Sequence, residues 1–131
     1  MGRLLSSSRL PLVAALAAAG LFSALPALAG DPGKGKAVFA SQCAMCHSAA
    51  KGGAPILGPT LFGVVGRKAG SLPGFTYSSA MKAAGFVWSD DKLKAYLPAP
   101  KALVPGTKMS YFGVKDPVKL DDLVAYLGTL K

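Results

Sequence analysis

Residues that bind metals or exchange protons are scarce in this chain. Its 131 residues include no Glu, one histidine (His47) and two cysteines (Cys43 and Cys46). A zinc site built from four Cys and His ligands is therefore excluded by counting. A disulfide between the two cysteines would close a loop with only two intervening residues and remove little entropy from the unfolded chain. Neither zinc binding nor cross-linking explains the cysteine pair.

The first 29 residues have the composition of an export signal. Nineteen of them are hydrophobic and none is acidic. Arg3 and Arg9 precede an apolar stretch over 10–25 that Gly20 interrupts, and residues 27–29 form the small-x-small pattern Ala-Leu-Ala. We therefore expect a secretory signal peptide over 1–29, cleaved after Ala29, and a bacterial protein located in the periplasm. The alternative is an uncleaved leader that anchors the chain to the membrane.

Residues 30–131 are expected to form one domain of 102 residues. They carry 13 Lys and Arg against 6 Asp, a net charge of +7. A chain this short buries a limited share of its surface, so small secreted domains commonly depend on a disulfide or a cofactor. The basic residues are scattered along the chain, which is typical of a solvated surface and does not predict nucleic-acid binding.

The two cysteines lie in the sequence Cys43-Ala44-Met45-Cys46-His47, which has the CxxCH pattern of covalent c-type haem attachment. On one helical turn two sulfurs at this spacing can reach the two vinyl groups of a porphyrin. The following histidine can then place a nitrogen on the iron. A redox-active CxxC of the thioredoxin type is less consistent with the flanking residues, which lack a strand-to-helix pattern.

The chemistry of a haem depends on the ligand opposite this histidine, and because no second His is present that position must hold a Met, a Tyr, a Lys or no protein ligand. A methionine thioether would raise the reduction potential and close the iron to small ligands. Met1 is lost with the leader, and Met45 lies between the attachment cysteines. Met109 follows Pro and Gly in a loop that could aim its side chain, whereas Met81 falls in a short predicted helix. These features favour Met109 and leave Met81 as the alternative.

Capping residues and hydrophobic periodicity predict an all-α fold. The expected helices begin after Asp31-Pro32, run over 78–84 and 90–97, and begin again after Asp116-Pro117. Residues 51–73 are rich in Gly and Pro and are expected to form a long ordered loop.

From residue 30 to the end, the chain resembles class I cytochromes c, in particular the branch of mitochondrial cytochrome c and bacterial cytochrome c2. Beyond CxxCH, the motifs that carry this resemblance are Gly58-Pro59, Gly66-Arg67-Lys68, Pro73-Gly74-Phe75-Thr76-Tyr77, Trp88, Tyr96-Leu97, Pro105-Gly106-Thr107-Lys108-Met109 and Asp122-Leu123-Val124-Ala125-Tyr126-Leu127. The resemblance implies a single domain of short helices around one covalent haem, with the first and last helices crossing.

The resemblance also implies roles for individual residues. Cys43 and Cys46 would form the thioether bonds, and His47 and Met109 would bind the iron. The carbonyl of Pro59 would accept a hydrogen bond from His47. The residues implied to contact the haem propionates are Arg67, Tyr77 and Trp88. Tyr96 and Thr107 would make polar contacts near Met109.

The chain departs from the family pattern at several positions. Gln42 replaces a common Lys before the first cysteine, Met81 replaces an Asn, and Tyr111 replaces a Phe two residues after the methionine ligand. Ala54 and Ile56 also replace basic residues. These departures leave the reduction potential open.

An iron with both axial positions filled offers no site to a substrate, so we expect an electron carrier and not an enzyme. It would be a monomer that shuttles single electrons from a cytochrome bc1-type complex to a terminal oxidase or a photosynthetic reaction centre. Lys101, Lys108 and Lys115 would face acidic docking patches on these partners. The alternative, a peroxidase-like haem enzyme, would need an open distal site with an acid or base.

Overall fold

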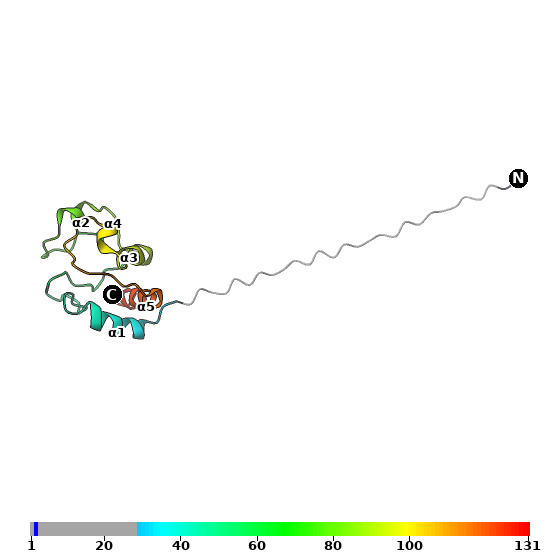
Figure 1. Ribbon diagram of the computed structural model, residues 1–131, viewed down its shortest axis with the longest axis horizontal. Helices are drawn as coiled ribbons and strands as arrows, with labels where there is room; N and C mark the ends of the chain where they lie inside the picture. The colour runs from blue at the N-terminus through cyan, green and yellow to red at the C-terminus, as the bar shows by residue number, and fades with distance from the viewer. Residues whose placement is uncertain (1, 3–28) are drawn as a thin grey trace.

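The computed structural model describes residue 2 and residues 29–131, so the predicted leader lies almost entirely outside the described residues. The described residues contain five helices, which are labelled in Figure 1. They are α1 (Pro32–Gln42), α2 (Ser79–Ala83), α3 (Asp90–Tyr96), α4 (Pro100–Leu103) and α5 (Pro117–Gly128). The described residues contain no strand beyond one isolated antiparallel bridge between Lys68 and Val87. The expected all-α fold is confirmed.

The two long helices begin in the same way. The carboxylates of Asp31 and Asp116 each accept hydrogen bonds from two backbone N–H groups of the following turn, and a proline occupies the first helical position. Ser78 and Ser89 cap α2 and α3 with their hydroxyl oxygens. All four predicted helix starts are therefore confirmed.

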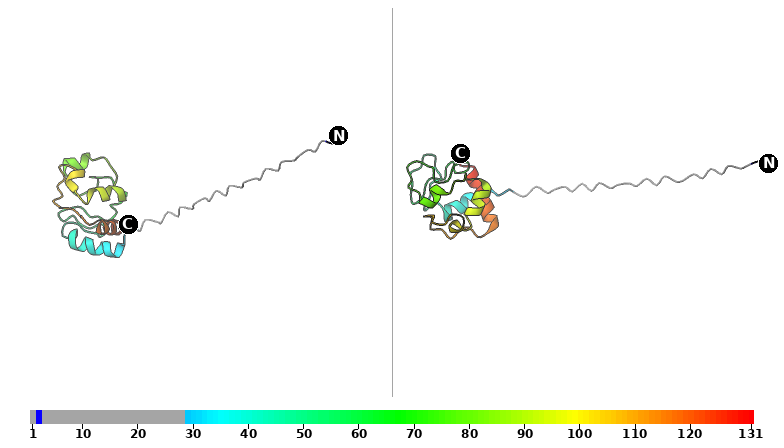
Figure 2. Two further views of the ribbon diagram at one scale, coloured as in Figure 1. Left: turned by 45° about the vertical axis from the view of Figure 1, so that its right-hand side comes forward. Right: turned by 90° about the horizontal axis from the view of Figure 1, so that it is seen from above.

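Helices α1 and α5 cross in close contact, side by side in both Figure 1 and Figure 2. A Cβ at Gly35 would collide with the backbone carbonyl of Asp122, so only glycine allows the two backbones to approach this closely. Beside this contact the rings of Phe39 and Tyr126 lie 5.5 Å apart, and Leu123 is completely buried. The predicted crossing of the first and last helices is confirmed.

Helices α2, α3 and α4 lie on the opposite side of the molecule from α1, as Figure 1 shows. Residues 51–73 contain no helix, as their Gly and Pro content predicts. Helix α4 was not predicted, because it has four residues and no side-chain cap, too few to show a hydrophobic period. None of the described helices combines the length and the hydropathy that a membrane crossing requires.

Candidate functional site

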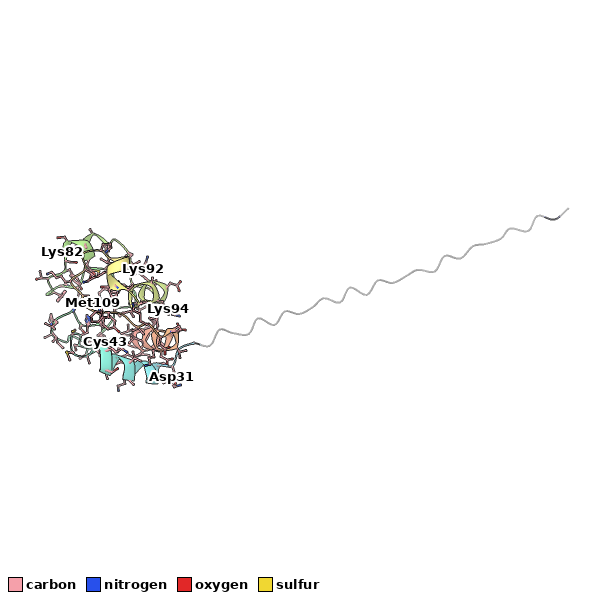
Figure 3. All side chains as sticks on the ribbon, in the orientation of Figure 1. Asp31, Cys43, Lys82, Lys92, Lys94 and Met109 are labelled. Atoms are coloured by element: carbon pink, nitrogen blue, oxygen red, sulfur yellow. The ribbon has the colours of Figure 1, made fainter. Side chains whose placement is uncertain are left out.

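A cavity of about 440 Å³ is lined by the end of α1, by residues of α2, α3 and α5, and by the loops that connect these helices. Figure 3 labels Cys43 at the end of α1 and Met109 in the segment that follows α4, and both residues line the cavity. The structure brings all ten sequence-predicted site residues to this one cavity, namely Cys43, Cys46, His47, Pro59, Arg67, Tyr77, Trp88, Tyr96, Thr107 and Met109.

His47 is held in one orientation and one tautomer. Its Nδ1 lies 2.7 Å from the carbonyl oxygen of Pro59, and because a carbonyl can only accept, Nδ1 must carry the proton. The lone pair is therefore on Nε2. Burial lowers the pKa of His47, and the charge of Arg67 acts in the same direction, while the hydrogen bond to Pro59 acts against them. The net lowering of the pKa favours the neutral ring.

Gly58 makes room for this histidine. A Cβ at position 58 would collide with the His47 ring, so a side chain there would push the imidazole out of place. The N–H of Gly58 donates to the carbonyl of Cys46 at 2.8 Å, which ties this loop to the attachment motif.

Met109 is held by a closed ring of hydrogen bonds. The hydroxyl of Tyr96 donates to Sδ of Met109 at 3.4 Å and lies 3.0 Å from the hydroxyl of Thr107. Because Tyr96 has one hydroxyl proton, Thr107 must be the donor in the second contact. The backbone N–H of Met109 in turn donates to Thr107 Oγ1 at 3.3 Å. Sδ keeps a second lone pair free.

The Cys43 thiol is unsuited to redox exchange. Burial, together with the nearby Cys46, raises the pKa of the Cys43 thiol to about 11. Reactive CxxC motifs need the opposite shift, because the thiolate is the nucleophile. Both cysteines are free, and both line the cavity as the attachment motif requires.

Arg67 is anchored by backbone carbonyls. Its two terminal nitrogens donate to the carbonyl of Thr60 at 3.0 Å, and one of them also donates to the carbonyl of Phe62 at 2.8 Å. A guanidinium has five N–H donors, so two remain for an anion in the cavity. Thr60 is itself buried, and the carbonyls of Ala50 and Ser48, at 3.0 and 3.2 Å from its Oγ1, share its single hydroxyl proton.

Aromatic rings and a second methionine complete the lining. The ring of Trp88 lies edge-on to that of Tyr96, with centroids 4.9 Å apart, and Tyr77 packs edge-on against Phe75 at 4.8 Å. Met81 is buried in α2 and also lines the cavity, whereas Met45 is 85% exposed.

Sequence reasoning missed two features of the site. The carbonyls of Thr60 and Phe62 that hold Arg67 are backbone atoms and leave no signal in the residue types. The hydroxyl of Tyr111 donates to Oε1 of Gln42, a contact between residues 69 positions apart. Gln42 and Tyr111 both differ from the family pattern. This shared departure was the one feature of the sequence that could have indicated their contact.

The residues present fit a covalent c-type haem. The cavity is lined mainly by apolar side chains, and its lining also includes two free cysteines, a histidine whose Nδ1 is already bonded and a methionine thioether. In the described part of the chain no three His, Cys, Asp or Glu side chains come together as a metal site. The donor set is thus that of a His/Met iron porphyrin.

Comparison with known proteins gives the same result. The family model for cytochrome c matches residues 33–131. The chain is 48% identical to cytochrome c2 of Rhodomicrobium vannielii over 117 residues, covering 89% of this chain and 93% of that protein. It is 49% identical to cytochrome c2 of Rhodopila globiformis over 102 residues, covering 78% and 95%.

A solved structure, cytochrome cH from Methylobacterium extorquens, superposes with a TM-score of 0.71 at 46% identity. The match covers 76% of this chain and 99% of that one. With the family model spanning most of the chain and relatives close to half identical, this chain belongs to the cytochrome c family.

Proposed function

We propose that Cys43 and Cys46 hold the haem covalently and that His47 and Met109 are the two axial ligands of its iron. The observation that carries this assignment is that His47 and Met109 line the same cavity, with Nδ1 of His47 bonded to the carbonyl of Pro59 and Sδ of Met109 accepting one hydrogen bond from Tyr96. Each side chain therefore presents one free lone pair. Arg67, Tyr77 and Trp88 are assigned to the propionates, and Tyr96 and Thr107 to the polar contacts near Met109.

The bound c-type haem supplies a one-electron ferric/ferrous couple. The chain's own residues keep the two ligands in place in both oxidation states. Pro59 fixes the imidazole, and the Tyr96–Thr107 pair fixes the thioether. Ligands held in this way need little rearrangement when the charge changes. The buried rings of Trp88 and Tyr96 and the buried side chains of Leu93, Leu97 and Leu123 help to exclude water.

Members of this family are electron carriers, and this chain is a soluble carrier of single electrons through one covalent haem. For its partners, we infer a quinol-oxidising complex of the cytochrome bc1 type as donor and a terminal oxidase or photosynthetic reaction centre as acceptor. The net charge of +7 on residues 30–131 favours fast encounter with acidic docking patches. Exposed Lys101, Lys108 and Lys115 are the cations assigned to that docking.

We further infer export to the periplasm, with cleavage after Ala29. The cleavage pattern at 27–29 supports this, and Gly30 begins the part of the chain that packs on α5, where a Cβ would collide with the carbonyl of Asp121. Intact-mass analysis of the purified protein should give residues 30–131 plus one haem. A mass that includes residues 1–29 would contradict cleavage and favour the anchored form.

Turnover with isolated complexes tests the function. Detergent-solubilised bacterial bc1 complex with quinol should reduce the holoprotein, and isolated cytochrome c oxidase should reoxidise it. Both rates should fall as salt is added, because screening weakens attraction between separated charges. Failure of both complexes to exchange electrons would contradict the carrier role, and a rate independent of salt would contradict electrostatic docking.

A further inference from the structure

Phe112 is the most exposed large hydrophobic side chain in the described part of the chain. Its exposed fraction is 95%, which leaves almost the whole ring in water. Isolated exposed hydrophobic residues are common on protein surfaces and need no explanation by themselves. The residues around this ring indicate a functional role for it.

The backbone that carries Phe112 is fixed on both sides. Gly113 has φ +98°, and a Cβ there would collide with the carbonyl of Pro98. The next residue, Val114, donates its N–H to the carbonyl of Leu97 at 3.0 Å. On the other side, Tyr111 is bonded to the side chain of Gln42. An aromatic ring presented from a fixed backbone loses little conformational freedom when it is bound.

Cations and a groove lie beside the ring. A groove of about 420 Å³ is lined by Phe112, Tyr111, Lys101 and Lys115, together with small residues of α4, and no acidic residue lines it. The carboxylate of neighbouring Asp116 accepts the N–H groups that begin α5, so it is engaged in capping. The ring therefore combines an apolar surface with a positive border.

This patch adjoins the redox site. Phe112 is three residues from Met109, and Tyr111, between them, lines both the cavity and the groove. A partner that covers Phe112 would approach the cavity from the side of the Met109 segment. Exposed aromatic anchors with a polar border are the usual energetic centres of protein interfaces.

We propose that Phe112 is the apolar anchor by which this chain docks its redox partner, a protein surface with an apolar pocket bordered by carboxylates. This inference rests on the proposed function and adds a residue-specific contact to it. A protein can insert a side chain into the adjoining groove, which a bilayer surface cannot do. A symmetric pair of copies would bring Lys101 and Lys115 of each copy close to those of the other, which like-charge repulsion opposes.

The test compares Phe112→Ala, Phe112→Tyr and wild-type holoprotein in turnover with isolated bc1 complex and with cytochrome c oxidase, at one ionic strength. Val118→Ala is the matched control, because Val118 is a 66% exposed hydrophobic residue on α5. We expect Phe112→Ala to raise KM for at least one complex about ten- to hundredfold, the range that corresponds to burying one such ring. Phe112→Tyr and Val118→Ala should remain within about twofold of wild type. Reduction potential and denaturation midpoint should not change.

The remaining outcomes would overturn the inference. An unchanged KM for Phe112→Ala with both complexes, while wild type turns over, removes Phe112 from docking and leaves the carrier role intact. If wild type floats with phosphatidylcholine/phosphatidylglycerol vesicles and Phe112→Ala does not, while the KM of Phe112→Ala is unchanged, the ring is assigned to a membrane instead. A concentration-dependent dimer in sedimentation that Phe112→Ala abolishes, again with unchanged KM, would assign it to a second copy. If neither complex turns over wild type, the proposed function itself fails.

Discussion

The hydroxyl of Tyr111 donates a hydrogen bond to the side-chain oxygen of Gln42. Gln42 is the last residue of α1, directly before Cys43, and Tyr111 is two residues after Met109. The bond therefore joins the attachment side of the cavity to the segment that carries the thioether. Both residues line the cavity, so the bond lies at its border.

Tyr111→Phe removes only the hydroxyl and should loosen the Met109 segment. An exposed hydrogen bond of this kind contributes about 0.5–1 kcal/mol. We therefore expect added imidazole to displace the Met109 sulfur about two- to fivefold faster, measured by stopped-flow absorption of the ferric protein. Gln42→Ala should have the same effect, and the double variant should add nothing to either single change. Fully additive effects would show that the two side chains act independently.

Tyr96→Phe should lower the reduction potential. The Tyr96 hydroxyl withdraws electron density from Sδ of Met109 through its hydrogen bond, which disfavours the ferric state. Loss of this bond should lower the potential by about 20–60 mV, equivalent to ~0.5–1.4 kcal/mol for a one-electron couple. Equilibrium redox titration measures the change, with Tyr126→Phe as a control, because Tyr126 packs against Phe39 and does not line the cavity. An unchanged or higher potential in Tyr96→Phe would show that the sulfur does not depend on this hydrogen bond.

Gly35→Ala should destabilise the holoprotein through the helix crossing. The new Cβ would collide with the carbonyl of Asp122, a backbone atom that cannot move aside cheaply. We expect a loss of about 2–4 kcal/mol in the free energy of unfolding, measured by guanidinium denaturation.

Gly128 on α5 provides the control, because a Cβ there meets nothing within 4 Å. Gly128→Ala should be neutral or stabilise the protein by up to about 1 kcal/mol. Equal stability of the two variants would mean that the backbones at the crossing can separate without cost.

The sequence predicted the parts of this fold that local chemistry determines. Asp31-Pro32 and Asp116-Pro117 specify helix starts by capping and by the fixed φ of proline, and the structure contains both helices. Helix α4 was missed because a four-residue helix without a side-chain cap has no periodicity to detect. The crossing of the first and last helices was implied by the resemblance to class I cytochromes c.

The site was predictable only in part, for a different reason. The CxxCH spacing identifies Cys43, Cys46 and His47, because these three residues of the site are close together in the sequence. The loop around Met109 favoured this residue over Met81, and the resemblance to a family strengthened the choice. In the structure both methionines line the cavity. The carbonyls that hold Arg67 are backbone groups, and the Gln42–Tyr111 contact joins distant positions, so neither could be derived from residue types alone.

Axial ligation by Met109 is the central claim, and near-infrared absorption of the ferric holoprotein tests it most directly. A thioether bound to ferric haem gives a weak sulfur-to-iron band. We predict this band in wild type and in Met81→Ala, and its loss in Met109→Ala together with a large fall in reduction potential. A band that persists in Met109→Ala, or that is absent from wild type, would contradict the account; its absence from wild type would favour a haem enzyme with an open iron site.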